Sequence, residues 1–458
     1  MAINNLYKGS IKSSMNGDNE PILLNKIIKT IRSISTGRIL LSFSGGLDST
    51  VLLHALVSLR QTTLKNLKIR AVYIHHGLND KADDWAIHCQ KICFDWKVEF
   101  YSQHVYIDSA KKGIEAAARD VRYQVFRKIL LPGEIIVTAH HLDDQAETFL
   151  LALKRGSGPT GLSAMPISIP FADTYLIRPL LSFSRQQLIL YAKKKSLSWI
   201  EDDSNQDQRY DRNFLRSTIM PNFNQRWPHF SLAVARSASL CAEQEALLNE
   251  LLKDYLSHLI IAEGTLQLDA LASYSEIKRN AILRRWLSLH LILMPSRVQL
   301  KQIWQDVICA RPDAEPQFIL DNNNVIRRFK QKLWLLPQFN DLTKICLAWE
   351  LPAAIKLPDS LGVLMISDHG TQFRAPLSNE KVTIRFGLKG NIKIIGRQHT
   401  RRSKKIWQEL GVPPWLRERT PLIYYNDELI AAVGVFITQS GQCIQGQPEL
   451  KVKWIRDK

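Results

Sequence analysis

Cysteine is scarce in this sequence, with six residues in 458. A disulfide framework uses dense, paired cysteines, so this count excludes one and favours a reduced, cytoplasmic protein. Cys89 and Cys93 share a face of a predicted helix, but no second pair accompanies them, which disfavours a metal or redox pair. No apolar run approaches the roughly 20 residues of a membrane span, and residues 1–19 lack an apolar secretory core. We therefore expect no membrane partner.

Acidic residues are outnumbered by basic ones. The chain has 43 Asp and Glu against 61 Lys and Arg, a formal net charge of +18 and a pI of about 9.6. This excess favours a polyanionic partner, most often a nucleic acid, although a merely basic surface has the same composition. The length predicts two or three domains, and a hydrophobic fraction of 45% suffices for ordinary globular cores.

A glycine-rich loop at residues 43–50 contains no lysine and does not match the Walker A pattern, which disfavours a simple ATPase or kinase of that class. Apolar residues 38–42 predict a buried strand before the loop, and residues 51–57 predict a helix after it. This order directs backbone N–H groups and the positive end of a helix dipole at one spot. The candidates for binding a nucleotide phosphate there are Ser44, Gly45, Gly46, Leu47, Asp48 and Ser49.

Asp48 is unexpected in a phosphate-binding loop, because a carboxylate repels a phosphate unless a cation lies between them. We therefore predict that Asp48 holds Mg²⁺. The alternative is an ordinary corner between a strand and a helix that binds no ligand. The strand–loop–helix context and the acid together favour the phosphate site.

Strands and helices alternate through the first 155 residues. Further strands are predicted at 67–74, 98–101 and 135–139, and helices at 84–96, 114–131 and 145–155. Alternation at these lengths predicts an α/β fold with a doubly wound parallel sheet covered on both faces. Ligands bind at the carboxyl ends of such strands. Polar clusters at residues 44–49, 75–78 and 140–144 each follow a strand, so we expect one shared active site.

Acids and imidazoles follow two of the predicted strands. Asp143, Asp144 and Glu147 lie at a helix start, where they are candidates for a magnesium or proton-transfer site. The alternative role for these acids is helix capping. A zinc site is compatible with the residue types, but the H-E-x-x-H spacing is absent. His76 ends the second strand and is predicted to face the nucleotide.

Four arginines are further candidates. Arg119 and Arg122 share one helix face, for which the alternative is a solvated basic surface. Arg178 precedes a proline that keeps it extended, which suits a positioned cation. Arg212 lies in a run, residues 209–216, that interleaves arginines with aromatic residues. We expect Arg178 and Arg212 to contact a substrate or RNA.

The second half of the chain has a different pattern. Residues 230–255, 274–291 and 296–309 predict helices, short strands follow at 318–320, 325–327 and 333–335, and the sequence is β-rich from about residue 349. A basic run at residues 397–405 holds five basic residues in nine and no acid. Its candidates for RNA phosphate contacts are Arg397, Arg401, Arg402, Lys404 and Lys405, with Trp407 for base stacking. A solvated basic loop is the alternative.

The loop at 44–49 is similar to the signature loop of the N-type ATP pyrophosphatases, which use ATP to adenylate a carbonyl oxygen and release pyrophosphate. A wider set of motifs resembles the tRNA(Ile)-lysidine synthases along essentially the whole chain. The motifs are SGGLDS (44–49), HHGL (75–78), EAAAR (115–119), HLDDQAET (141–148), RGSG (155–158), RPL (178–180), WIEDDSN (199–205) and KKIWQELGVPPW (404–415). The loop alone identifies only the superfamily, whereas the acidic run and the C-terminal segment are far more specific.

This resemblance implies an adenine nucleotide alpha hydrolase-like catalytic domain, a mostly helical middle domain and a β-rich, tRNA-binding C-terminal domain. We expect their limits at residues 1–220, 221–345 and 346–458. The resemblance implies a cytoplasmic ligase that uses ATP and Mg²⁺ to join free L-lysine to the wobble cytidine of an isoleucine tRNA with a CAU anticodon. AMP and pyrophosphate leave, and the product is lysidine. The oligomeric state is left open, with a homodimer among the states considered.

The resemblance also suggests roles. Asp48, alone or with Asp143 or Asp144, would neutralise the departing pyrophosphate through Mg²⁺. The arginines at 119, 122 and 178 are candidates for stabilising phosphate charge or orienting the base. A carboxylate must bind or deprotonate the lysine amine, and Asp143, Asp144 and Glu147 all stay open for that role.

Two other functions fit parts of the sequence. A tRNA thiolase carries a similar loop but needs reactive cysteines, and the predicted active clusters contain none. A non-catalytic RNA-binding protein with a decayed nucleotide loop would keep the basic run. The intact loop at 44–49 and the acidic cluster disfavour that second alternative.

Overall fold

A computed structural model of the chain describes residues 19–32, 37–77, 79–107, 114–203, 207–261, 264–290, 294–311, 314–321 and 323–457. Contacts divide the chain into two compact units, residues 1–251 (unit 1) and 252–458 (unit 2). The three domain limits expected from the sequence stay predictions. Within the described ranges, no helix combines the length and the apolar character that crossing a lipid bilayer requires.

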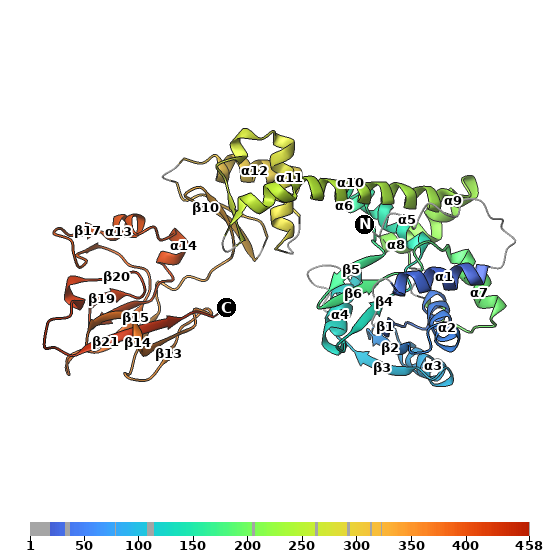
Figure 1. Cartoon of the computed structure of the whole chain (residues 1–458), viewed down its shortest axis with the longest axis horizontal. Helices are drawn as coiled ribbons and strands as arrows, with labels where there is room; N and C mark the ends of the chain where they lie inside the picture. The colour runs from blue at the N-terminus through green and yellow to red at the C-terminus, as the bar shows by residue number, and fades with distance from the viewer. Residues whose placement is uncertain are drawn as a thin grey trace. The chain divides into compact units, whose positions relative to one another are not determined.

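Unit 1 is built on a six-stranded sheet (Figure 1). Its order is β3-β2-β1-β4-β6-β5, with β5 antiparallel to β6 and every other pair parallel. The strands are β1 (Arg38–Ser42), β2 (Lys68–His75), β3 (Glu99–His104), β4 (Glu134–Val137), β5 (Ser168–Phe171) and β6 (Thr174–Ile177). The predicted parallel sheet is confirmed, and the β5–β6 hairpin is an addition that the sequence pattern does not predict.

Helices cover both faces of this sheet. Ile39 and Leu41 of β1 pack into a cluster with α1 (Asn19–Arg32), α2 (Leu47–Thr62), α3 (Ala82–Asp95) and α7 (Arg185–Lys194). Leu40 points to the other face, where it packs with Val125 and Phe126 of α4 (Ile114–Ile129). Successive side chains of a strand point to opposite faces, so an unbroken apolar strand indicates a sheet buried on both sides. The doubly wound arrangement follows from this pattern.

The sheet has its topological switch point at β1. This strand lies between β2 and β4, so the connections from it run toward both edges. Open α/β sheets bind ligands in the crevice that such a reversal leaves at the carboxyl ends of the strands. Residues 43–46 follow β1, and residues 138–141 follow β4 and lead into α5 (Leu142–Lys154). The phosphate loop and the acidic helix start therefore lie at the same edge of the sheet.

The chain then passes through several short helices before a long one. These are α6 (Pro159–Leu162), α8 (Asp211–Phe214), a π-helical turn η2 (Leu215–Ile219), α9 (Met220–Arg226) and α10 (Phe230–Leu259). Wide π turns within helices are rare and often lie at functional sites. The π turn here carries Arg216, whose contacts are described below.

Unit 2 begins with a five-stranded antiparallel sheet in the order β7-β8-β11-β10-β9. Its strands are β7 (Ile260–Ile261), β8 (Thr265–Gln267), β9 (Gln317–Ile319), β10 (Asn324–Phe329) and β11 (Lys332–Pro337). The helical elements are η4 (Leu271–Ser273), α11 (Glu276–Ser288), α12 (Arg297–Gln302) and a π turn, η5 (Ile303–Ile308). The expected helices and the last three strands are present, whereas the short β7 and β8 lie within a segment for which the sequence predicts only helices.

The rest of unit 2 is β-rich, as predicted. One sheet has the order β12-β15-β18-β19-β20, with strands Cys346–Ala348, Val382–Arg385, Leu422–Tyr425, Glu428–Ala432 and Phe436–Ile437. A second has the order β13-β14-β21, with strands Ile355–Lys356, Val363–Arg374 and Glu449–Ile455. Leu364 and Phe373 of β14 pack with Ile384 of β15 and Ile423 of β18 in one hydrophobic core. Side chains of the two sheets thus share a single core.

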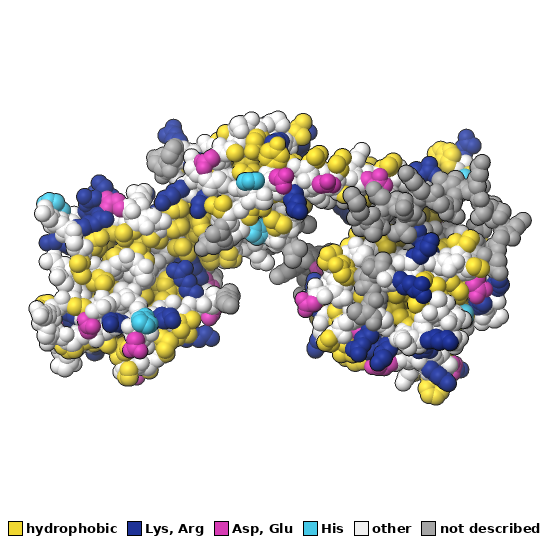
Figure 2. Space-filling view, viewed as in Figure 1, with side chains coloured by type: hydrophobic (Ala, Val, Ile, Leu, Met, Phe, Trp, Pro, Cys, Tyr) yellow, Lys and Arg dark blue, Asp and Glu magenta, His cyan; other side chains and the backbone are white. Residues whose placement is uncertain are grey.

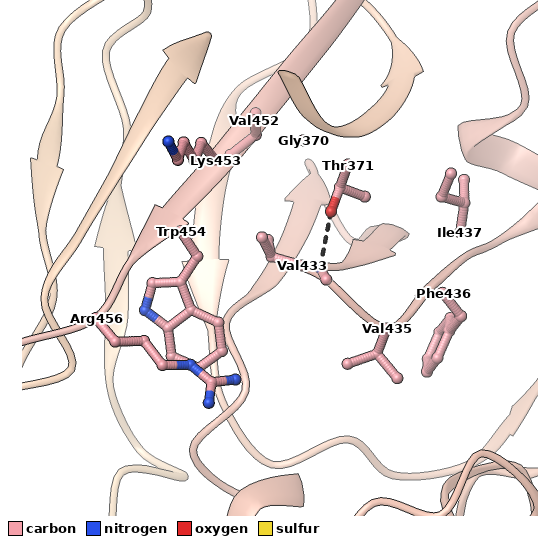
Figure 3. A pocket seen from close by; sticks show the side chains of 11 residues that line it. Gly370, Thr371, Val433, Val435, Phe436, Ile437, Val452, Lys453, Trp454 and Arg456 are labelled. Atoms are coloured by element: carbon pink, nitrogen blue, oxygen red, sulfur yellow. Dashed lines mark hydrogen bonds between the residues drawn. The ribbon is translucent and has the colours of Figure 1, made fainter.

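The same part of unit 2 also contains the pair β16 (Asn391–Ile392) and β17 (Arg401–Arg402), the helices α13 (Ser403–Glu409) and α14 (Pro414–Arg417), and a short 3-10 turn, η6 (Gln439–Gly441). A hollow of about 500 Å³ opens beside β21 (Figure 3). Trp454 and Arg456 form part of its wall, with the guanidinium 4.2 Å from the centre of the indole ring. The sequence pattern does not predict this hollow.

Candidate active site

The loop between β1 and α2 turns sharply at Gly45. Its backbone has φ +76°, and an added Cβ would lie 2.6 Å from Ile200 Cδ1 and 2.7 Å from Cys89 Sγ. The Ile200 N–H also donates to the Gly45 carbonyl at 2.9 Å. Gly46 follows as the extended N-cap of α2. Because a side chain has neither the space nor the favoured φ at residue 45, the turn requires glycine there.

Hydroxyl groups hold this loop in shape. The Ser44 N–H donates to Ser49 Oγ at 3.3 Å, and that hydroxyl donates to the Gly46 carbonyl at 3.0 Å. Thr50 Oγ1 donates to the Gly45 carbonyl at 3.2 Å. The loop and the first turn of α2 are therefore fixed to each other, with the positive end of the helix dipole at the loop. This arrangement fits an anion such as a phosphate.

Asp48 lies in the first turn of α2, with 31% of its side chain exposed. Its Oδ1 atom is buried and has no hydrogen-bond partner among the described residues, and Oδ2 lies 3.6 Å from His141 Nε2. Burial raises the pKa of Asp48 against the effect of His141, and Asp144 adds to the rise. A buried, unpartnered carboxylate oxygen beside a phosphate loop fits a hard cation such as Mg²⁺.

His141 joins the phosphate loop to α5. It is the N-cap of that helix, and its Nδ1 accepts a hydrogen bond from the Asp143 N–H at 3.2 Å. The Asp144 carboxylate accepts from the His141 N–H at 3.0 Å in return, which completes a capping box. The other ring nitrogen, Nε2, lies 3.4 Å from Asp144 Oδ2 and 3.6 Å from Asp48 Oδ2. His141 thus holds the two carboxylates near each other.

Three acids form a group hereafter called the acidic cluster, namely Asp48, Asp144 and Glu147. Arg216 forms ion pairs with two of them, Asp144 and Glu147. Arg216 Nη2 lies 2.7 Å from Asp144 Oδ1, and its Nε lies 2.8 Å from Glu147 Oε1. Arg212 Nε lies 3.3 Å from the other oxygen of Glu147. The planar guanidinium of Arg216 therefore bridges Asp144 and Glu147 of α5, a geometry that lysine does not reproduce.

These contacts set the charges of the acidic cluster. Burial favours the neutral acid at Asp144, but His141, Arg216 and a backbone N–H together hold the pKa of Asp144 below its usual range. Burial raises the pKa of Glu147, against the effect of Arg216. The carboxylates outweigh burial at Arg216 and raise its pKa. Of Asp144 and Glu147, Asp144 is therefore the acid that stays ionised more firmly.

Asp143 has a different role from its neighbour. Its Oδ2 accepts from the Arg185 N–H at 2.8 Å, at the start of α7, and its Oδ1 accepts from the Ser231 hydroxyl at 3.0 Å, on α10. Both oxygens are therefore used to tie three helices together. Of the three acids that sequence reasoning left open, Asp144 and Glu147 belong to the acidic cluster and Asp143 fixes the surrounding helices.

A second set of side chains, hereafter the basic pocket, consists of Arg119, Arg122, Arg178, His76 and His140. Burial, together with Arg178 and Arg122, lowers the pKa of His140 to about 3. Burial and Arg122 likewise lower the pKa of His76 to about 4. Both imidazoles are neutral near pH 7, whereas the arginines carry the charge. The pocket therefore combines positive charge with uncharged rings that donate and accept hydrogen bonds.

The arginines of the basic pocket are held firmly. Arg178 is 2% exposed, donates through Nη1 to the Pro166 carbonyl at 2.8 Å and leaves its buried Nε without a partner within the described part of the chain. Burial lowers the pKa of Arg122 and of Arg178. The Arg119 guanidinium lies 5.3 Å from the centre of the Tyr123 ring. Arg122 is half-buried and Arg119 is exposed, but burying the charge of Arg178 is costly unless an anion or a polarised ligand joins it.

The basic run of unit 2 is organised differently. Arg397 and Arg401 both pair with Glu409, while Arg402, Lys404 and Lys405 are exposed. Lys and Arg side chains gather over the part of unit 2 that carries β17 and α13 (Figure 2). A hollow of about 450 Å³ is lined by five residues here, namely Arg397, Gln398, His399, Arg401 and Glu409. This surface suits phosphate contacts.

The predicted base-stacking role of Trp407 is corrected by the structure. Trp407 is only 2% exposed and lies 5.3 Å from the Phe436 ring, within a hydrophobic cluster that also contains Ile406 and Leu422. Because the ring faces are covered by protein, no face is free for a base. Leu47 is likewise 4% exposed in the core of unit 1, so only its backbone faces the phosphate loop.

Comparison with known proteins identifies the family of this chain. Three family models match the chain: a PP-loop domain over residues 19–223, a TilS substrate binding domain over 266–334 and a TilS substrate C-terminal domain over 382–454. The tRNA(Ile)-lysidine synthase of Photorhabdus laumondii is 59% identical over 417 residues, which are 91% of this chain and 94% of the relative. The chain belongs to the tRNA(Ile)-lysidine synthase family.

Two more members of the tRNA(Ile)-lysidine synthase family show the same agreement. The enzymes from Edwardsiella ictaluri and Serratia proteamaculans are each 53% identical to this chain, over 92% and 91% of it and 95% of each relative. The resemblance stated from the motifs is thus confirmed, including a ligase with a PP-loop domain that uses ATP. The family match covers the phosphate loop, the acidic cluster and most of unit 2 together.

Sequence reasoning missed two residues that organise this site. The signal for Arg216 was its place as the last arginine of the run at 209–216. It comes four residues after Arg212, so a helix would put both on the same face. His141 was visible as a polar residue at a helix start, although histidine is not among the preferred caps. Leu78 and residues 204–205, which belong to two of the quoted motifs, lie outside the described residues.

Proposed function

We propose that this chain joins free L-lysine to the wobble cytidine of an isoleucine tRNA with a CAU anticodon and consumes ATP in doing so. Membership of the tRNA(Ile)-lysidine synthase family supports the tRNA substrate. The observation that carries the proposal is the meeting of a phosphate loop, the acidic cluster and the basic pocket at one edge of the sheet of unit 1. A nucleotide, an amine and a heterocyclic base each have a matching environment there.

The first step is adenylation of the base. The carbonyl oxygen of cytosine attacks the α-phosphate of ATP, and pyrophosphate leaves. The N–H groups at the start of α2 bind the phosphates, and the arginines of the basic pocket stabilise the charge that develops on the transferring group. Asp48, through its unpartnered Oδ1, would hold Mg²⁺, and such an ion would supply positive charge to offset the charge on the leaving pyrophosphate.

The basic pocket receives the base. A nucleotide in an anticodon loop leaves its stack at low cost, so it reaches a buried site more easily than a paired one. His76 Nδ1 is buried without a hydrogen-bond partner in the described structure, and the low pKa of His76 keeps its ring neutral. A neutral imidazole reads the edge of cytosine by donating or accepting, and Arg122 next to it polarises the carbonyl.

The second step replaces AMP by lysine. The ε-amine attacks the ring carbon, AMP leaves with the former carbonyl oxygen, and the amine passes a proton to the Asp144 carboxylate. We assign Asp144 to the amine, because it stays ionised and 12% of its side chain is exposed, against 1% for Glu147. Glu147 is a positioning residue that fixes Arg212 and Arg216.

Unit 2 supplies contacts to the tRNA. The exposed residues Arg402, Lys404 and Lys405 suit backbone phosphates, which position an RNA without reading its sequence. Cytoplasmic location stays a prediction from the sequence, and the oligomeric state stays open.

The direct test uses purified chain, Mg-ATP, radiolabelled lysine and an isoleucine tRNA transcript with a CAU anticodon. Lysine incorporation and AMP release are followed together. One lysine on the wobble base for each AMP released is the expected result. AMP release without incorporation would keep the adenylation and reject lysine as the nucleophile, while no release of AMP would reject the proposal.

The alternative function is sulfur transfer, and the properties of the thiols in unit 1 argue against it. Cys89 Sγ lies behind Gly45, and burial raises the pKa of Cys89. Burial also raises the pKa of Cys93 to about 12. A sulfur-transferring cysteine needs an accessible thiolate with a lowered pKa, so both thiols are unsuited to that chemistry.

A further inference from the structure

Two histidines stand side by side at the carboxyl ends of β2 and β3. The register of these parallel strands pairs His75 with His104, so both side chains lie on the same face of the sheet. Their rings are stacked, with centres 4.1 Å apart and planes inclined by 27°. The backbone of the sheet therefore holds the two imidazoles together independently of any ligand.

A carboxylate faces this pair from the start of α3. Asp83 Oδ1 lies 3.2 Å from His75 Nε2, and Asp83 itself is in the first turn of the helix. The Tyr73 hydroxyl, two residues before His75 on β2, donates to the Ala82 carbonyl at 3.1 Å. This bond fixes the start of α3 against the strand and places the adjacent Asp83 beside the imidazoles.

The nitrogen at the centre of this group lacks a hydrogen bond. His75 is 8% exposed, and its Nε2 is buried without a hydrogen-bond partner in the described residues. One ligand atom from each of His75, Asp83 and His104 lies within 4.8 Å of the others, the only such group of three that the described ranges contain. A buried, unbonded imidazole nitrogen next to a second imidazole and a carboxylate is the arrangement that a metal ion would complete.

We propose that His75, Asp83 and His104 bind a divalent transition-metal ion of the class that prefers imidazole, with Zn²⁺ as the representative. Two imidazoles and one carboxylate suit Zn²⁺, Co²⁺ or Ni²⁺, whereas Mg²⁺ prefers oxygen ligands and an octahedral shell. The site is therefore chemically distinct from the magnesium site at Asp48. It does not depend on the proposed reaction.

The location of the site suggests what the ion does. Binding joins the ends of β2 and β3 to the start of α3, and His76 of the basic pocket is the next residue after His75. Asp83 is 80% exposed, so an ion reaches the site from solvent and keeps open coordination positions for water. Because the three ligands meet only in the folded chain, bound metal stabilises the folded unit 1.

Cobalt provides the test, since its visible absorption reports ligand type. The full chain without an affinity tag is stripped with a chelator and titrated with Co²⁺ in millimolar Mg²⁺, and Zn²⁺ is then added in competition. One equivalent of Co²⁺ should bind with visible bands that Zn²⁺ removes. His104→Ala and Asp83→Asn should each weaken Co²⁺ binding by roughly tenfold or more. Even the loss of a residue that only hydrogen-bonds to a metal ligand lowers metal affinity by roughly 10–100-fold. The control His369→Ala, at an exposed histidine of unit 2, should leave binding unchanged.

Thermal unfolding supplies a second readout that does not involve activity. Zn²⁺ should raise the Tm of the wild-type chain and not that of His104→Ala, while both unfold alike with a chelator present. His104 is exposed, so its loss does not disturb the core, unlike loss of the buried His75. An unchanged Co²⁺ affinity in both variants, or full displacement of Co²⁺ by Mg²⁺, would overturn the proposal.

Discussion

The acidic cluster of unit 1 and the basic run of unit 2 both concentrate charge of one sign, but they hold it in different ways. Asp144 and Glu147 are buried and bridged by one guanidinium, Arg216, at distances of 2.7 and 2.8 Å. Arg402, Lys404 and Lys405 are exposed side chains. A buried charge depends on a defined partner, whereas an exposed one is shielded by water and salt.

From this difference we infer that the buried acidic cluster serves catalysis, whereas the exposed basic run serves tRNA binding. The loss of one buried partner leaves another charge uncompensated, so single substitutions in the acidic cluster should have large effects. Exposed phosphate contacts act additively and weaken with salt, so single substitutions in the basic run should have small effects. The predictions below test whether the two regions divide the work in this way.

The largest effect is expected at Asp48. Asp48→Asn keeps the size of the side chain and removes the charge that holds Mg²⁺. AMP release should fall by roughly 10²-fold or more, the cost of losing one preorganised electrostatic contact in an active site. The tRNA affinity, measured by filter binding, should stay within about twofold, because most of it comes from phosphate contacts. A loss of tRNA affinity as large as the loss of AMP release would contradict the assignment of Asp48 to the nucleotide.

Removal of Arg216 should have the next largest effect. Arg216→Ala leaves Glu147 with Arg212 alone and Asp144 with His141 alone, and it should lower the free energy of unfolding by about 3 kcal/mol. Arg216→Lys should recover only part of the lost stability, since an ammonium group does not bridge two carboxylates as the planar guanidinium does. Urea unfolding measures both variants.

An ion pair of the same segment provides the control. Arg209 pairs with Asp207 at 2.7 Å, but 86% of the Arg209 side chain is exposed. Arg209→Ala should lower the free energy of unfolding far less than Arg216→Ala, because water and salt screen an exposed ion pair. Similar losses for Arg209→Ala and Arg216→Ala would show that burial does not distinguish the two pairs.

Gly45→Ala should have an intermediate effect. Both Gly45 and Gly37 have positive φ, +76° and +86°, but only an added Cβ at residue 45 meets atoms closer than 3 Å. Each alanine should cost about 1 kcal/mol from the backbone, and Gly45→Ala a further 1–3 kcal/mol from crowding. The KM for ATP should rise only for Gly45→Ala. Equal stability and an unchanged KM in both variants would contradict a tightly packed phosphate loop.

The smallest effect is expected in the basic run. The double variant Lys404→Glu with Lys405→Glu should weaken tRNA binding and reduce the slope of log affinity against log salt by roughly one to two. Lys356→Glu, an exposed change on β13 of unit 2 and outside the basic run, is the matched control. The rate of AMP release at saturating tRNA should not change. A salt slope equal to that of the control would count against the basic run as a tRNA surface.

The sequence predicted those features correctly for which a short local pattern is compatible with only one structure. A continuous apolar strand, two glycines and a helix predict the phosphate loop, since few other structures accommodate that order. The alternation of strands and helices predicts the parallel sheet, which in turn brings the loop and the acidic helix start to one edge. The family resemblance and the family comparison agree on the activity.

Other features depend on contacts between distant residues. The partners of Asp144 and Glu147 lie about 70 residues later, at Arg216, and no local pattern pairs them. Trp407 was misassigned because an aromatic residue beside a basic run fits both a stacking surface and a hydrophobic core. The alternation of exposed and buried residues in α13 decides between the two, and it places Trp407 inside.

The most direct test of the division of labour uses Asp144→Asn and ATP radiolabelled at the α-phosphate. This variant keeps the phosphate loop and Asp48 but loses the ionised acid that we assign to the lysine amine. Label should appear on the tRNA and persist when lysine is added, whereas the wild-type chain should lose it as lysine enters. A variant that forms lysidine at the wild-type rate, or one that never labels the tRNA, would contradict the account.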